Sequence, residues 1–131
     1  MILVDTSVWV DYLRDASTPA TGFVADRIGA TLATTEPILM EVLAGSRPGL
    51  QATQLERLLH SQTWYQVEAD LDFRGAADVY HATRATGHQP RSLLDCLIAA
   101  VALRQGIAVA HRDRDFERIA AATGLEVVDL R

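Results

Sequence analysis

The sequence of 131 residues contains no lysine, and all 12 of its basic residues are arginine. A P-loop nucleotide site and a pyridoxal-phosphate enzyme both need a lysine, so both classes are excluded. The single cysteine, Cys96, excludes a disulfide framework and any multi-cysteine zinc or iron–sulfur site. The longest strongly apolar run, 96–103, is far shorter than the ~20 residues of a membrane-spanning helix. We therefore expect a cytoplasmic protein with reduced thiols and no membrane partner.

The sequence also has fewer basic than acidic residues. The 17 acidic residues outnumber the 12 basic ones, which gives a net charge of −5, the wrong sign for a generic nucleic-acid binder. An acidic cluster that holds a divalent cation nevertheless reverses the charge locally, so a nucleic-acid substrate is not excluded. Hydrophobic residues make up 49% of the sequence, enough for the core of one domain spanning residues 1–131.

Short apolar segments alternate with amphipathic ones along the chain. The pattern predicts strands at residues 2–4, 31–33, 64–67, 107–110 and 126–128. It predicts helices at about 6–14, 21–28, 36–44, 50–60, 71–86, 93–105 and 115–122. Such alternation favours an α/β fold, a three-layer sandwich in which helices flank a central parallel sheet. In these sheets the functional groups gather beyond the carboxyl ends of the strands.

Three acids stand where a charge is unexpected. Asp5 directly follows the first predicted strand, and taken alone it is most simply a helix cap. Glu41 lies in an otherwise apolar helix, where a side chain that reaches solvent is an equally good interpretation. Asp95 is the only charge between Arg91 and Arg104, and it also suits the N-terminus of its helix.

Two further acids, Asp113 and Asp115, follow the fourth predicted strand and precede a helix, which is ordinary capping chemistry. In a parallel sheet, Asp5 and Asp113 leave the same edge, and the helices of Glu41 and Asp95 pack against that sheet. Clustered carboxylates repel one another unless a cation or a proton intervenes. Because oxygen-only ligands suit Mg²⁺ or Mn²⁺, the pattern predicts a divalent-metal site at this edge.

The chain resembles the PIN-domain ribonucleases, in particular the VapC toxins of bacterial toxin–antitoxin pairs. The resemblance covers essentially the whole chain and implies the PIN-like α/β fold. It rests on four motifs in order: Ile-Leu-Val-Asp5-Thr-Ser-Val-Trp, Ile-Leu-Met-Glu41-Val-Leu-Ala-Gly, Leu-Leu-Asp95-Cys-Leu-Ile-Ala-Ala and Arg-Asp113-Arg-Asp115-Phe.

The resemblance implies an endoribonuclease that depends on Mg²⁺, with Mn²⁺ as a substitute, and that cuts transfer or ribosomal RNA. A cognate antitoxin of the VapB type would restrain it, and a homodimer and a toxin–antitoxin hetero-oligomer are expected. The catalytic and metal-binding acids of the family carry over onto Asp5, Glu41, Asp95 and Asp113, with Asp115 as an accessory acid.

His111 stands where the family often has serine or threonine. A histidine there could bind metal, contact phosphate or simply pack, so it is a second accessory candidate. Arg91, Arg112 and Arg114 lie near the predicted site in sequence and are candidates for contacts with RNA phosphates. Solvated surface arginines are an equally consistent interpretation of all three.

Two other functions stay open at this point. A non-catalytic module of the same fold could bind an antitoxin, although mutually repelling carboxylates would then have no purpose. A phosphoryl-transfer domain could use Asp5 as a nucleophile, but such enzymes usually carry a second acid where Ser7 stands, and a later lysine. Metal-dependent cleavage of a structured RNA distinguishes these functions from a ribonuclease.

Overall fold

The computed structural model describes residues 1–131 and contains one five-stranded sheet of order β3-β2-β1-β4-β5. The strands are β1 (Ile2–Val4), β2 (Leu32–Thr34), β3 (Thr63–Trp64), β4 (Ala108–His111) and β5 (Val127–Asp129). Every neighbouring pair is parallel. The chain leaves β1 toward β2 and β3 and returns to β4 on the other side. The gap between β1 and β4 is therefore the point where the strand order reverses, which is where open α/β sheets bind ligands.

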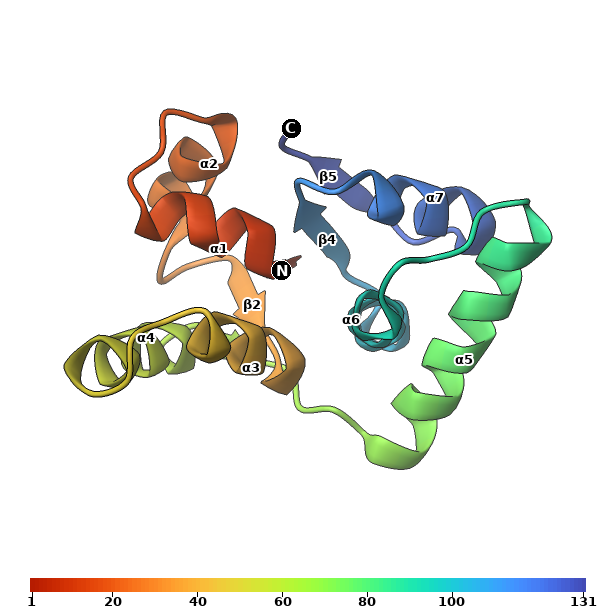
Figure 1. Ribbon diagram of the computed structural model, residues 1–131, viewed down its shortest axis with the longest axis horizontal. Helices are drawn as coiled ribbons and strands as arrows, with labels where there is room; N and C mark the ends of the chain where they lie inside the picture. Colours follow the sequence, from red (N-terminus) through yellow and green to blue (C-terminus); the bar gives the residue numbers. More distant parts are fainter.

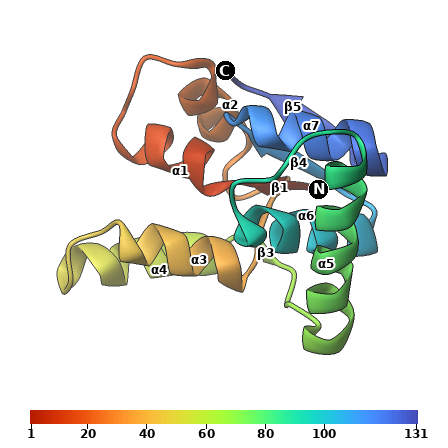
Figure 2. The same cartoon turned by 45° about the vertical axis from the view of Figure 1, so that its right-hand side comes forward.

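Seven helices flank this sheet, as the alternating pattern predicts. They are α1 (Thr6–Leu13), α2 (Pro19–Arg27), α3 (Glu36–Ala44), α4 (Leu50–His60), α5 (Ala69–Ala85), α6 (Leu93–Gln105) and α7 (Arg114–Thr123). Figure 1 shows α1 and α2 grouped apart from α3 and α4, with α5 and α7 on the opposite side of the molecule. In the turned view of Figure 2, α2 and α7 lie above the strands and α3 and α4 below them, while α5 runs along the right-hand side. The predicted three-layer α/β fold is confirmed. None of the helices combines the length and apolar character that a membrane span requires.

The central helix, α6, explains much of the core. Every residue from Cys96 to Ala102 is buried, so this helix contacts protein on almost all sides. Its first turn carries Asp95, and Ser92 caps it by accepting hydrogen bonds from the N–H groups of Leu94 and Asp95. A helix that is apolar all round lies deep in the fold, and Asp95 is placed at the end of it that meets the edge of the sheet.

Most predicted boundaries lie within one or two residues of the observed ones, and two of the differences involve side-chain contacts. Strand β3 ends at Trp64 rather than at residue 67, and beyond it the N–H of Val67 donates to the Glu36 carboxylate of α3 at 2.6 Å. Helix α5 begins at Ala69, so Asp70 lies in its first turn and is not its cap. The capping contact comes instead from Asp72, whose carboxylate accepts the N–H of Glu68 at 2.7 Å.

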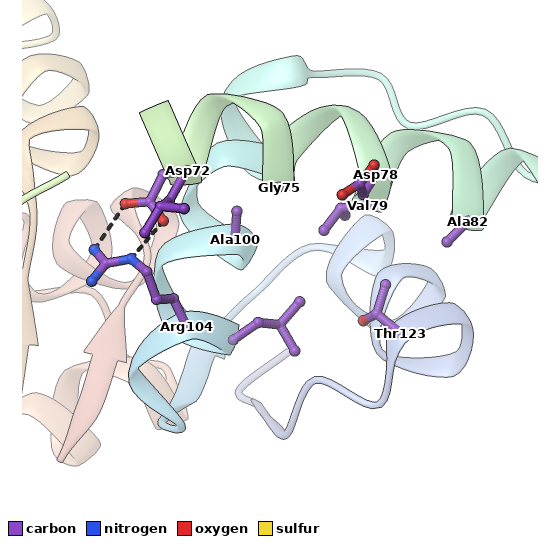
Figure 3. A pocket seen from close by; sticks show the side chains of 10 residues that line it. Asp72, Gly75, Asp78, Val79, Ala82, Ala100, Arg104 and Thr123 are labelled. Atoms are coloured by element: carbon purple, nitrogen blue, oxygen red, sulfur yellow. Dashed lines mark hydrogen bonds and ion pairs between the residues drawn. The ribbon is translucent and has the colours of Figure 1, made fainter. Parts of the chain in front are cut away.

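Helices α5, α6 and α7 enclose a hollow of about 550 Å³, drawn in Figure 3. Gly75 allows α5 to approach α6 closely, since an added Cβ would lie only 3.3 Å from the Cβ of Ala100. At one end the guanidinium of Arg104 donates to both carboxylate oxygens of the buried Asp72, at 2.8 and 2.9 Å. None of the acids predicted for the site lines this hollow, so we treat it as part of the packing between helices.

Candidate active site

Asp5 stands directly after the central strand and is buried. Its backbone N–H donates to the carbonyl of Ala110 on β4 at 2.9 Å, which places it at the reversal of strand order. Its carboxylate caps α1 by accepting from the hydroxyl and the N–H of Ser7, at 2.7 and 3.3 Å. Burial raises the pKa of Asp5, and the contacts with Ser7 oppose that shift only in part. The capping role and a place at the site are thus compatible.

Asp113 and Asp115 enter from the turn between β4 and α7. Asp113 caps α7 and accepts the N–H of Asp115 at 3.0 Å. Asp115 is only 2% exposed, and its Oδ1 has no hydrogen-bond partner although it is buried. Its Oδ2 accepts from Arg91. A buried carboxylate oxygen without a hydrogen-bond donor is costly, and the guanidinium of Arg118 compensates for it only as a long ion pair, at 3.6 Å.

Asp95 is the point on which the other acids converge. One ligand oxygen each from Asp95, Asp113 and Asp115 lie within 4.8 Å of one another. The pKa of Asp95 is raised from 3.8 to about 8, chiefly by burial and then by the negative charges of Asp5, Asp113, Glu41 and Asp115. In the absence of a cation, Asp95 is therefore largely protonated at neutral pH.

Glu41 reaches the same edge of the sheet from α3. Its Oε1 accepts the hydroxyl hydrogen of Thr6 at 2.8 Å, and this bond holds it against the residue that follows Asp5. Burial raises the pKa of Glu41, and the neighbouring charge of Asp5 adds to that shift. The structure thus gathers all five acids, from four separate segments. We refer to Asp5, Glu41, Asp95, Asp113 and Asp115 as the acidic site.

The chemistry of the acidic site fits a hard divalent cation. Its donors are carboxylate oxygens, which suit Mg²⁺ and Mn²⁺ better than softer metals. The pKa of Asp95, raised by burial and by the negative charges of four neighbouring acids, is a sign of negative charge that the protein itself does not fully neutralise.

The environment of His111 favours one of its three predicted roles. The ring is fully buried, and its Nδ1 accepts the backbone N–H of Asp113 at 3.0 Å. The proton of the neutral ring therefore lies on Nε2, which is 3.0 Å from a carboxylate oxygen of Glu117 and donates to it. With both ring nitrogens engaged, His111 supports the turn that carries Asp113.

The three predicted arginines lie beside the acidic site and differ in their ion pairs. Arg91 pairs with Asp113 at 3.0 Å and with Asp115 at 3.1 Å. Arg112 pairs with Asp11 of α1 at 2.5 Å, while Arg114 is exposed and forms no ion pair.

Two residues next to the acidic site were not predicted from the sequence. They are Thr6, whose hydroxyl holds Glu41, and Arg118, which lies 3.6 Å from Asp115. The role of Thr6 could have been predicted from its position next to Asp5.

Comparisons with known proteins agree with the motifs. The PIN domain family matches residues 2–122. "Ribonuclease VapC11" of Mycobacterium tuberculosis and "VapC ribonuclease Mb1587" of Mycobacterium bovis are each 42% identical to this chain over 139 residues. Each match covers 100% of both proteins.

Solved structures show the same fold. The Mycobacterium tuberculosis toxin VapC20, described as cleaving the sarcin–ricin loop, superposes with a TM-score of 0.69 at 25% identity, covering 100% of this chain and 99% of that one. DNA-bound VapBC from Salmonella typhimurium gives a TM-score of 0.73 at 17% identity, covering 98% of both chains. The full-length matches confirm the resemblance seen in the sequence: the chain belongs to the PIN-domain family and, within it, to the VapC ribonucleases.

Proposed function

We propose that this protein is a metal-dependent endoribonuclease that serves as the toxin of a VapBC pair. The observation that carries the proposal is the convergence of five acids at the reversal of strand order, with Asp95 at the centre of their combined field. The ribonuclease names of the full-length relatives support RNA as the substrate. Hydrolysis of a phosphodiester bond in transfer or ribosomal RNA is the reaction.

In this proposal Asp5, Glu41, Asp95 and Asp113 are the catalytic and metal-binding residues, and Asp115 is an accessory acid. Mg²⁺ is the physiological ion and Mn²⁺ a substitute. A bound divalent cation supplies an electrophile that stabilises charge on the phosphate and activates water. The protein's own contribution is to orient the ligands.

Two hydroxyl groups perform most of this orientation. Ser7 holds the Asp5 carboxylate and Thr6 holds Glu41, so the first turn of α1 positions two acids at once. The pKa of Asp95 is raised to about 8, and a cation held by the acidic site would favour its ionised form. Binding of the cation at neutral pH would then release a proton.

The partner in this proposal is a VapB-type antitoxin. Structural neighbours of this chain are VapBC complexes, some of them bound to DNA. A protein that cuts cellular RNA needs such an inhibitor, and its arginine side chains could pair with the acidic site in place of the cation. We expect a homodimer of this chain inside the hetero-oligomer.

The test is cleavage of a structured RNA by the purified protein, with sequencing of the new 5′ ends. Wild-type protein should cut in Mg²⁺ or Mn²⁺ and not in EDTA, and Asp95→Asn should be inactive. A wild-type protein that folds, binds its antitoxin and leaves every RNA intact would support the non-catalytic module instead. Phosphorylation of Asp5 without RNA cleavage would support the phosphoryl-transfer domain.

A further inference from the structure

A second hollow, of about 530 Å³, adjoins the acidic site and is lined only by charged residues. Its walls are Arg91, Arg112, Arg114, Arg118 and Arg131, together with Asp113. We call it the arginine hollow. In a chain with a net charge of −5, five of the 12 arginines meet at this one place.

Folding brings Arg91 and Arg131 to the short segment at the start of α7 that carries Arg112, Arg114 and Arg118. Arg91 lies in the loop before α6, Arg118 lies on α7, and Arg131 is the last residue of the chain. The C-terminal segment is brought beside the β4–α7 turn because the N–H of Leu130 donates to the carbonyl of His111 at 2.8 Å. Figure 1 shows this end of the chain close to the end of β4.

Two of the guanidinium groups are held in place before any ligand binds. Arg112 donates through one terminal nitrogen to Asp11 at 2.5 Å and through Nε to the carbonyl of Leu130 at 3.1 Å. Arg131 is paired with Asp129 at 2.6 Å. A guanidinium has five N–H donors, so each group keeps donors for a ligand while its orientation is already fixed.

The remaining arginines supply charge that the protein does not fully neutralise. Arg114 has no ion pair, and Arg118 has only a long contact of 3.6 Å with Asp115. Arg91 is paired with Asp113 and Asp115 but its side chain is 72% exposed. Carboxylates that ligate a cation attract these arginines less, so metal binding at the acidic site increases the positive charge available in the hollow.

We propose that the arginine hollow binds a phosphodiester group of the RNA next to the group that is cleaved. This inference rests on the proposed function, since Asp113 is shared by the hollow and the acidic site. Arginine matches the geometry of phosphate through paired N–H donors. An acidic protein segment fits less well, because the hollow has no apolar wall for the side chains that anchor protein interfaces.

The experiment measures RNA binding without cleavage. In an Asp95→Asn background, Arg114→Gln, Arg118→Gln and Arg131→Gln are tested against a fluorescent single-stranded RNA over a range of KCl concentrations. Each substitution should weaken binding by about tenfold at low salt, as expected for one lost charge-assisted contact. It should also reduce the slope of log affinity against log salt by about 0.7.

The matched control is Arg74→Gln on α5, which removes the same charge. Arg74 is exposed and its only ion pair is with Asp70 of the same helix, so affinity and slope should stay unchanged. Wild-type slopes in all three hollow variants would overturn the inference while leaving the proposed function intact. Loss of antitoxin binding with unchanged RNA binding would also overturn it and assign the hollow to the partner. A wild-type protein that neither binds nor cuts RNA would refute the proposed function itself.

Discussion

Replacing Asp95 by asparagine should stabilise the metal-free protein increasingly between pH 4 and pH 8, and it should abolish activity. Asparagine keeps the size of the side chain and removes its charge. The aspartate is held in a place where its charged form is unfavourable, because burial and four neighbouring acids raise its pKa from 3.8 to about 8. Charge on this residue therefore opposes folding when no cation is present.

The magnitude follows from the size of this shift. A carboxyl group whose folded pKa is raised favours the folded state below its unfolded pKa, and it loses that advantage as pH rises to the folded value. At about 1.4 kcal/mol for each pKa unit, the shift sets an upper limit of about 6 kcal/mol at pH 8. Since Asp95 is only partly buried, we expect about half of this, or a gain of roughly 10 °C in melting temperature for a chain of this size.

The assay is thermal unfolding in EDTA at a series of pH values from 4 to 8. The melting temperature of Asp95→Asn should match that of the wild type near pH 4 and exceed it increasingly toward pH 8. Millimolar Mn²⁺ should raise the melting temperature of the wild type only, because a ligand of the folded state stabilises it. Asp26→Asn, on the exposed surface of α2, serves as the control.

A different outcome would contradict the reasoning. If Asp95→Asn is less stable than the wild type at pH 8, the contribution of Asp95 to the N-terminus of α6 exceeds the repulsion among the acids. If the variant folds and still cuts RNA at the wild-type rate, the acidic site is not the catalytic centre.

Asp5→Asn should lower the rate of RNA cleavage by about a hundredfold or more and Asp115→Asn by less; equal losses in single-turnover assays would contradict the accessory role of Asp115. Expression without the neighbouring antitoxin gene should slow growth and co-expression should restore it, whereas equal growth would remove the toxin role. Asp72→Asn should destabilise the protein by about 1–2 kcal/mol at pH 7. Burial opposes ionisation of Asp72, but Arg104 and the backbone of Glu68 hold its pKa below 3.8. This stabilisation is present above pH 3.8 and is lost as pH falls further, so chemical denaturation should show the difference between wild type and variant shrinking in acid.

Much of the fold can be predicted from local sequence patterns. The apolar runs that end at Val4 and near Ala110 are too short for helices, so they predict strands. Helices lie between successive strands, and this alternation predicts a parallel sheet. The order of four acidic motifs also indicated the family, and the full-length matches confirm it. These features are local, because strand, helix and cap preferences act over a few residues.

The tertiary structure alone decided how distant segments share hydrogen bonds. The N–H of Val67, beyond the end of β3, donates to Glu36, which is far away in sequence. Arg131 reaches the arginine hollow because the carbonyl of His111 accepts the N–H of Leu130. Contacts of this kind depend on how the whole chain folds. The residue pattern within one segment does not determine which distant segment will lie next to it.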